Sequence, residues 1–309
     1  MTRPRARYGG VETIQVGEHA VEITRPDKPL FPCGISKADL ARYYEAIAGA
    51  MLPHVAARPL NLERYPDGIA GRRIIQQRAG EHFPDWIERV TVPKAGGTVT
   101  HVVASNPATL VYLAGQACIT LHAWLSRIDR LDRPDRMIFD LDPSDGSLAD
   151  VRRAAREIGA LLRELGLEPY AMTTGSRGFH VTVPLQRDPD FDAVRGFARE
   201  VARVAVARDP QLTLEPRKAA RGGRILVDVM RNVYAHTAVA PYSVRARPGA
   251  PVATPLSWDE LSKPGTRPDR WTLRTVPDRL ARAGDPWSDI QSSARALDQP
   301  RRRLRDLPF

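Results

Sequence analysis

The stretch RMIFDLDPSDG, residues 136–146, sets Asp140 and Asp142 one residue apart in an otherwise apolar run. Strand side chains alternate between two faces, so Met137, Phe139 and Leu141 face one side and both aspartates face the other. Two carboxylates about 7 Å apart along a strand would repel each other in a half-buried place, and a divalent cation between them would relieve the repulsion. The alternative is a solvated strand end whose aspartates cap a turn, and this motif alone leaves both readings open.

A third carboxylate favours the metal reading. In GRILVDVMRN, residues 223–232, Asp228 interrupts another apolar, β-branched strand, where an isolated acid is rare unless it is paired. Three strand-borne carboxylates suit a two-metal site for phosphoryl transfer, and oxygen ligands suit Mg²⁺ or Mn²⁺. The sequence therefore predicts Asp140, Asp142 and Asp228 as catalytic residues that bind two divalent ions, Mn²⁺ or Mg²⁺.

A glycine-rich turn in TTGSRGFHVTVPL, residues 173–185, can serve phosphate binding. Gly175 and Gly178 allow a tight turn whose N–H groups can cradle phosphate oxygens. The same segment supplies hydroxyls, a permanent charge and an imidazole, and a plain hairpin with an incidental histidine is the alternative. The predicted phosphate contacts are Thr174, Ser176, Arg177 and His180.

Two further segments concentrate arginine: EPRKAARGGR, residues 215–224, and YSVRARPG, residues 242–249. Alternating arginines on an extended segment share one face, which suits a grip on triphosphate. As solvated charges they would be unremarkable. Together with the carboxylates, Arg221 and Arg245 indicate a site for nucleotidyl transfer.

Composition bounds the class of protein. The 309 residues are 42% hydrophobic and 27% charged, which fits one large globular domain or two modest ones. With 46 Lys and Arg against 36 Asp and Glu, the net charge of +10 favours a polyanionic partner. Cys33 and Cys118 show no paired spacing, which argues against a disulfide framework or a zinc site. Without a membrane span or the apolar core of a signal peptide, we expect a cytoplasmic, nucleoid-associated protein.

Periodicity predicts alternating helices and strands. Helices are expected within 35–55, beginning after Ser36 and ending before Pro53, then after Asn106, over 147–169 with a stop at Gly166, and over 190–210. After residue 240 proline is dense and periodicity weakens, which indicates an extended segment wrapped over the core. Strands are expected at 19–24, 59–64, 72–79, 119–124, 137–143, on both sides of the turn in 170–185, and at 223–230.

Taken in order, these motifs resemble one known family. FDLDP, TTGSRGFHVTVPL, LVDVMRN and TAVAPYSVRARPGAPVATPLSWDEL are similar to the archaeo-eukaryotic primase superfamily, and most of all to the polymerase domain of the bacterial ATP-dependent DNA ligase D. DKPLFP, KADLARYYEAIAGAMLPH and RPLNLERYPDG match the N-terminal part of that family. The resemblance covers roughly residues 15–285.

The pattern and the resemblance together predict an α+β fold with two closely packed lobes. A central mixed or antiparallel sheet, flanked by helices, would form a primase-type catalytic core. The expected organisation is a basic flexible tail over 1–14, a single primase-polymerase domain over 15–290, and a basic, solvated tail over 291–309. Within the domain, the N-terminal lobe would span about 15–105 and the catalytic core about 106–290.

The resemblance also implies an activity: a template-dependent nucleotidyltransferase that adds nucleotides, often ribonucleotides, at gaps and broken DNA ends. It implies that the three aspartates bind the metal ions and that Lys28 binds a 5′-phosphate. It also implies that His122, together with the phosphate contacts named above, lies at the nucleotide. Two positions depart from the family, because Thr174 stands where serine is usual and Arg177 where lysine is usual. Arg64, Ile74 and Ile75 are the other predicted DNA contacts, and IIQQR replaces the stacking aromatics of many relatives.

The partners that the resemblance implies are gapped or broken DNA with a 5′-phosphate and NTP or dNTP, together with a separate ATP-dependent DNA ligase and Ku. The chain would act as a stand-alone polymerase, in end joining or in short-gap filling. Two rival readings use the same residues. One is a non-catalytic module that binds DNA ends or gaps, and the other is a metal-dependent nuclease.

Overall fold

The acidic strand β10 (Arg136–Asp142) lies inside a six-stranded sheet. The structure, a computed structural model, describes residues 9–144 and 148–307. The β13–β14 pair is parallel and the other pairs are antiparallel, so the predicted mixed sheet is confirmed. The strand order is β13 (Leu212–Thr213), β14 (Ile225–Asp228), β10, β12 (Phe179–Pro184), β11 (Tyr170–Thr173) and β16 (Pro255–Leu256).

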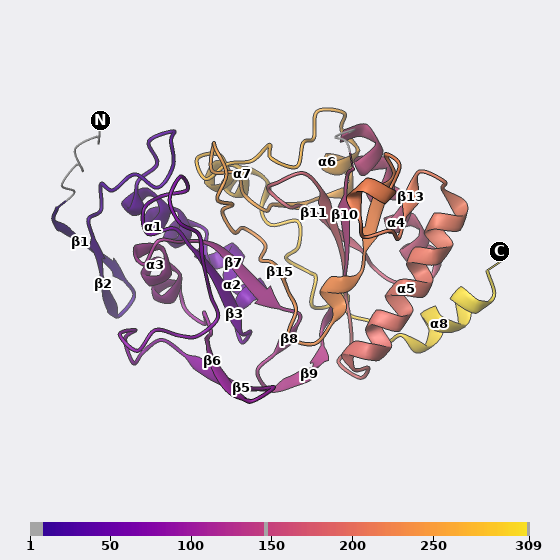
Figure 1. Cartoon of the computed structure of the whole chain (residues 1–309), viewed down its shortest axis with the longest axis horizontal. Helices are drawn as coiled ribbons and strands as arrows, with labels where there is room; N and C mark the ends of the chain where they lie inside the picture. The colour runs from indigo at the N-terminus through magenta and orange to yellow at the C-terminus, as the bar shows by residue number, and fades with distance from the viewer. Residues whose placement is uncertain (1–8, 145–147, 308–309) are drawn as a thin grey trace.

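Two long helices cover the apolar face of this sheet (Figure 1). α4 (Leu148–Glu164) and α5 (Phe191–Arg208) pack against β10, whose Phe139 and Leu141 are fully buried. Both helices were predicted, and so was the stop at Gly166, which has a φ of +84°. Because apolar side chains fill one face of the sheet, the acidic side chains of β10 lie on the other.

A second sheet occupies the N-terminal half of the molecule (Figure 1). The helices α1 (Lys37–Ala46), α2 (Ala48–Val55) and α3 (Pro107–Gly115) and the hairpin of β1 (Val11–Val16) and β2 (His19–Thr24) pack around it. Its strand order is β15 (Thr237–Val239), β7 (Cys118–Trp124), β3 (Leu60–Arg64), β6 (Gly97–Val102) and β5 (Arg89–Lys94), with β4 (Ile74–Gln76) paired to β3.

Strands from the later part of the chain complete the second sheet and so connect the two halves. β7 and β15 belong to the second sheet although they lie beyond residue 105, so the boundary predicted there does not divide the sheets. A short ribbon of β8 (Ser126–Arg127) and β9 (Arg130–Pro134) leads from β7 into β10, and the one-turn helices η1 (Lys218–Ala220) and η2 (Met230–Asn232) flank β14. The expectation of closely packed lobes fits this arrangement.

The helix expected to end before Pro53 is instead two helices, so that prediction is wrong. Ser36 caps α1 as expected, in a capping box with Asp39. The chain then breaks at Ile47, where φ is −100° and ψ is 4°, and α2 continues through Pro53 to Val55. A proline inside a helix lacks one N–H donor and crowds the carbonyl four residues before it. Here α2 ends two residues after Pro53.

The segment after residue 240, expected to be extended, also contains three helices: α6 (Trp258–Ser262), α7 (Val276–Ala283) and α8 (Asp298–Arg305). They are too short to give a clear 3.6-residue period. α8 corrects the solvated tail predicted for 291–309, because it packs on α5 and buries Leu304. Likewise β1 begins at Val11 inside the tail predicted for 1–14, while residues 1–8 lie outside the described part.

None of the helices in the described part of the chain combines the length and the apolar character needed to cross a bilayer.

Candidate active site

Three ionisable side chains form a row across the central sheet. Asp140 on β10 is directly opposite Asp228 on β14 and directly opposite His180 on β12. Opposite residues of antiparallel strands point to the same face, with Cβ atoms about 5 Å apart. Asp142 lies two residues along β10 and shares this face. The register of three strands therefore gathers both aspartates of the opening motif with the third carboxylate and the histidine.

A histidine and an arginine hold the Asp140 carboxylate. His180 Nε2 lies 3.4 Å from its Oδ1, and Arg231 Nη2 lies 3.1 Å from its Oδ2. Burial alone would raise the pKa of Asp140, but the charges and hydrogen bonds of His180 and Arg231 outweigh it and lower the pKa to about 2. The carboxylate is therefore ionised throughout the physiological pH range.

The other two carboxylates are held differently. Asp142 is partly exposed, with its Oδ2 3.6 Å from Arg221 Nη1 and its Oδ1 4.0 Å from Arg177 Nη2. Asp228 Oδ1 accepts a 2.7 Å hydrogen bond from the backbone N–H of Met230, which fixes the start of η2. The acids thus keep short contacts with positive groups or N–H donors.

The glycine-rich turn is built to lie against β10. A Cβ on Gly178 would stand 2.0 Å from the carbonyl oxygen of Leu141, so only glycine fits there. Gly175 has a φ of +62° and leaves room for the side chain of Arg245. The Gly178 N–H donates to Thr174 Oγ1 at 3.3 Å, so this N–H closes the turn.

Two of the predicted arginines are anchored by backbone carbonyls. Arg221 is buried and donates from Nε and Nη2 to the carbonyls of Glu215 and Pro216, at 3.0 and 2.8 Å. Arg245 donates from Nη1 to the carbonyl of Thr174 at 2.9 Å. Burial lowers the pKa of Arg245. Fixed in this way, both guanidinium groups are presented to the acidic face with little freedom to move.

The second sheet contributes His122. Its Nε2 lies 3.3 Å from Oε2 of Glu63, a partner on β3 that the sequence did not single out. Burial lowers the pKa of His122, while the hydrogen bond to Glu63 opposes this shift. The ring N–H at Nε2 donates to the Glu63 carboxylate. Burial raises the pKa of Glu63, but hydrogen bonds from His122 and Tyr65 and the charge of Arg73 lower it overall, to about 2.

One cavity of about 320 Å³ brings these groups together. Two buried nitrogens at its wall, Nδ1 of His180 and Nη1 of Arg221, have no hydrogen-bond partner within the described residues. Arg231 also lines it and was missed, although it stands in the LVDVMRN motif, three residues after Asp228. All ten residues predicted for catalysis and nucleotide binding line this cavity: His122, Asp140, Asp142, Thr174, Ser176, Arg177, His180, Arg221, Asp228 and Arg245.

The four predicted DNA contacts lie outside the cavity. Ile74 and Ile75 stand on β4, paired with Arg64 and Glu63 of β3, and the Ile75 side chain is exposed. Arg64 is engaged by the Gln116 carbonyl at 3.0 Å and by Gln76 Oε1 at 2.7 Å. Lys28 Nζ is 2.7 Å from Asp67 Oδ1.

The donor set of the cavity has the chemistry of a divalent-cation site, because carboxylate oxygens are the ligands that Mg²⁺ and Mn²⁺ prefer. In residues 9–144 and 148–307, however, no three acidic, His or Cys side chains are close enough to form a ready-made metal cluster. The Asp140 carboxylate forms an ion pair with Arg231, and the Asp228 carboxylate accepts a hydrogen bond from the Met230 N–H. Cation binding would therefore need these side chains to turn.

Three comparisons with known proteins agree. Residues 36–287 match the family described as the LigD primase-polymerase domain. Among curated relatives, the chain is 34% identical over 284 residues to the multifunctional non-homologous end joining protein LigD of Mycolicibacterium smegmatis, covering 90% of this chain and 37% of the relative. The LigD of Pseudomonas aeruginosa is 32% identical over 306 residues, covering 96% of this chain and 36% of that protein. The chain thus spans well under half of these relatives.

A solved structure has the same fold. The polymerase domain from Mycobacterium tuberculosis ligase D, in complex with DNA, superposes with a TM-score of 0.83 at 30% sequence identity. The match covers 88% of this chain and 98% of that one. The α+β architecture expected from the sequence is therefore confirmed.

Proposed function

This chain belongs to the LigD primase-polymerase domain family, and from that premise we propose that it is a template-dependent primase-polymerase of DNA repair. It adds nucleotides, ribonucleotides among them, to a primer at a gap or a broken DNA end. The observation that carries the proposal is the row of Asp228, Asp140 and His180, with Asp142 beside it, in a cavity rimmed by arginines. Nucleotidyl transfer needs carboxylates for metal ions and fixed cations for phosphates in one place.

Asp140, Asp142 and Asp228 would hold two divalent ions, Mn²⁺ or Mg²⁺. Such ions, when bound, favour ionisation of the attacking hydroxyl and neutralise charge on the leaving group. The residues of the chain itself grip the triphosphate: Arg221 and Arg245 are already immobilised by backbone carbonyls, and a preset donor loses little freedom on binding. The exposed Arg177 closes over the phosphates, Thr174 and Ser176 supply hydroxyls, and His180 offers its free nitrogen.

His122 lines the cavity from the side of the second sheet. Its imidazole, held by Glu63, presents a fixed ring edge to the nucleotide. Lys28 holds a downstream 5′-phosphate, while Arg64, Ile74 and Ile75 contact the template strand. Because the named relatives are end-joining proteins, an ATP-dependent DNA ligase activity and Ku are the partners that we propose.

The test is extension of a primer across a gapped duplex whose downstream strand carries a 5′-phosphate. NTP and dNTP pools are offered separately, each with Mn²⁺ and with Mg²⁺. We expect templated extension by the native chain, and a loss of at least about 100-fold in the Asp140→Ala, Asp142→Ala double variant, since two of three metal ligands are gone. Gap binding should survive, because other residues hold the DNA.

The matched control is the Asp192→Ala, Asp259→Ala double variant, which removes the same charge from two exposed positions outside the cavity. It should extend like the native chain. Normal extension by the Asp140→Ala, Asp142→Ala variant would overturn the assignment. Degradation of DNA with metal but without nucleotides would instead support a nuclease.

A second candidate is a non-catalytic module that binds DNA ends or gaps. It is favoured by the pairing of Asp140 with Arg231, which satisfies the central carboxylate without a cation. This candidate predicts firm binding of the gapped duplex and no extension with any metal or nucleotide. The assay above separates the two directly.

A further inference from the structure

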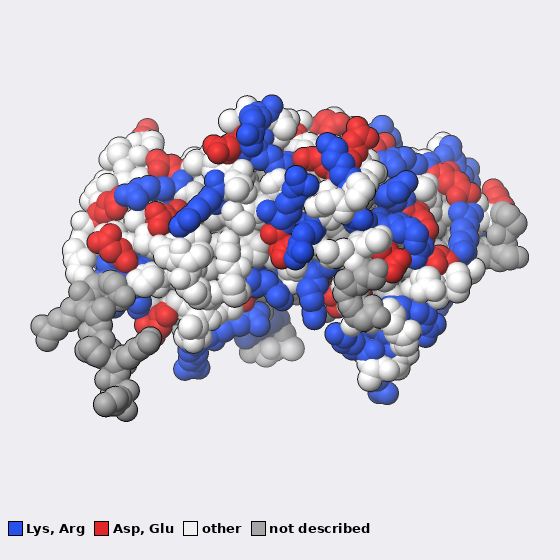
Figure 2. All heavy atoms as spheres, turned by 90° about the horizontal axis from the view of Figure 1, so that it is seen from above, with Lys and Arg blue, Asp and Glu red and all other residues white. Residues whose placement is uncertain are grey.

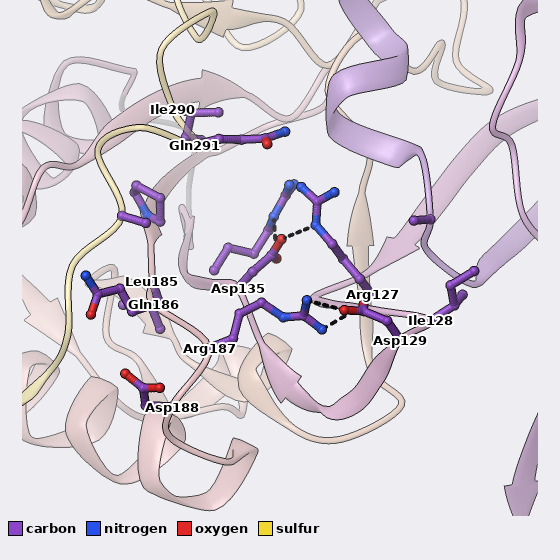
Figure 3. A pocket seen from close by; sticks show the side chains of 14 residues that line it. Arg127, Ile128, Asp129, Asp135, Leu185, Gln186, Arg187, Asp188, Ile290 and Gln291 are labelled. Carbon is purple, nitrogen blue, oxygen red and sulfur yellow. Dashed lines mark hydrogen bonds and ion pairs between the residues drawn. The ribbon is translucent and has the colours of Figure 1, made fainter.

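A cavity apart from the acidic site lies on the seam between the two halves (Figure 3). Its volume is about 710 Å³, within the range of small-molecule sites. The cavity is lined by Arg127 of β8 and the turn residues 128–129, the segment 184–188 at the end of β12, and residues of the segment 290–294, together with Ala57, Asp135 and Arg136. It shares no lining residue with the cavity that holds Asp140.

Three arginines meet one carboxylate beside this cavity. Arg58 donates from Nη2 to Oδ2 of Asp135, Arg127 donates from Nε to the same oxygen at 2.8 Å, and Arg136 Nε lies 3.5 Å from Oδ1. Arg58 is fully buried, and the Arg136 side chain is only 8% exposed. One carboxylate neutralises one of the three charges, and uncompensated charge is costly away from water.

The neighbouring charges do not remove this excess. Arg187 lines the same cavity, but its two Nη atoms bind both oxygens of Asp129 at 2.7 and 2.8 Å, so that pair is neutral. Figure 3 shows Asp188 well apart from Arg127 and Asp135. Burial and the charge of Arg58 lower the pKa of Arg136 to about 9, which still leaves it charged at pH 7. The positive excess is therefore local to the end of the cavity formed by Arg127 and Arg136.

We propose that this cavity is a second anion site, which takes a small phosphate-bearing ligand with its phosphate between Arg127 and Arg136. A phosphate carries close to two negative charges at neutral pH, which balances the local excess, and guanidinium forks match its oxygens. The volume leaves room for a group of nucleotide size behind the phosphate. Because the Arg136 side chain is only 8% exposed, a phosphate reaches it inside the cavity, which favours a small ligand over a duplex backbone.

The probe is inorganic pyrophosphate, titrated into the full chain by calorimetry and by the midpoint of thermal unfolding. EDTA is present, so metal-dependent binding at the acidic site does not contribute. We expect saturable binding that raises the midpoint. Arg127→Gln should weaken it about tenfold or more, since one charged donor is lost while Asp135 keeps Arg58 and Arg136.

A second variant tests the same cavity without touching the arginine cluster. Gln186 is exposed and lines the cavity, so Gln186→Glu adds a negative charge there and should also weaken binding. The matched control is Arg130→Gln, which removes an exposed arginine from the same ribbon but outside the lining. Its affinity for pyrophosphate should equal that of the native chain.

Three results would overturn the proposal. The first is native affinity in both Arg127→Gln and Gln186→Glu. The second is loss of binding in Arg245→Gln alone, which would place pyrophosphate at the acidic site. In the third, a 5′-phosphorylated oligonucleotide binds, pyrophosphate and AMP do not, and Arg127→Gln abolishes the oligonucleotide binding. That result would make a DNA end the occupant. Primer extension by Arg127→Gln stays native in each case, so failure here is distinct from failure of the proposed polymerase.

Discussion

At the scale of single residues, Asp140 is the most constrained position of the candidate site. It faces Asp228 and His180 on the neighbouring strands, and Arg231 covers its second oxygen. Its identity was clear from the sequence because an acid inside an apolar strand stands out. Its partner Arg231 was not, because Arg231 is one of 46 basic residues and lies 91 positions away.

The lowered pKa of Asp140 predicts a pH-dependent contribution to stability. A carboxyl group whose pKa falls on folding, from 3.8 to about 2, stabilises the fold above pH 4 and loses that effect as the pH falls through 2. Asp140→Asn should therefore cost about 2 kcal/mol of unfolding free energy at pH 7. The difference from the native chain should shrink between pH 4 and pH 2.

Urea unfolding of both proteins in metal-free buffer, at several pH values between 2 and 7, checks this. A variant as stable as the native chain at pH 7 would show that His180 and Arg231 do not stabilise the ionised carboxylate.

At the scale of elements, β10 is held in place by a side chain as well as by its neighbouring strands. Asn232 of η2 is buried; it accepts a hydrogen bond from the Ile138 N–H at 2.8 Å and donates to the Ile138 carbonyl at 2.7 Å. A third bond, of 2.9 Å, reaches the carbonyl of Val229. This amide therefore pairs the backbone of β10 beyond the point where β14 ends.

Asn232→Ala should cost about 3 kcal/mol of stability, because it leaves buried backbone groups of β10 without partners. Extension should fall too, since Asp140 and Arg231 lose their common support. Asn106→Ala is the matched control. The Asn106 side chain caps α3 by accepting a hydrogen bond from the Thr109 N–H, and its loss should cost about 1 kcal/mol of unfolding free energy.

Urea unfolding and primer extension on both variants distinguish the two roles. The Asn106 variant should keep native activity because α3 lies outside the cavity. Equal activity in the Asn232 variant would mean that the amide stabilises the protein without positioning the site.

At the scale of the whole molecule, the two halves are interleaved rather than joined end to end. Tyr44 of α1 is buried and donates to the Ile119 carbonyl at 2.7 Å, while its oxygen accepts from the Val244 N–H at 3.2 Å. β15 completes the sheet of the opposite half. Figure 2 shows many Lys and Arg side chains over the middle of one face, with fewer acidic ones among them.

The net charge of +10 predicts salt-dependent binding of DNA. The logarithm of affinity for a gapped duplex should fall linearly with the logarithm of salt concentration. Lys28→Ala should reduce the slope by about 1, because one phosphate contact is lost. Ile75→Ala should weaken binding without changing the slope, since an apolar contact releases no counterion.

Fluorescence anisotropy across a salt series measures both slopes. An unchanged slope in Lys28→Ala would show that its ammonium stays with Asp67 rather than binding phosphate.

Features that depend on local periodicity could be read directly from the amino-acid sequence. The alternation in β10, the amphipathic faces of α4 and α5, the glycine turn after β11 and the three strand-borne acids all follow from residues within one element. The order of those motifs also carried the family resemblance. Signals of this kind weaken in short elements, which is why α6, α7 and α8 were missed.

Which charged side chains pair with one another depends instead on how the chain packs in three dimensions. The pairing of Glu63 with His122, of Arg231 with Asp140, and of three arginines with Asp135 joins residues that are mostly far apart in the chain. An arginine at the surface and an arginine in a buried cluster look alike in the sequence, because both carry the same charge. They differ in the free-energy cost of burying that charge, which depends on where the side chain lies in the fold. Strand register and packing between the halves settle that difference.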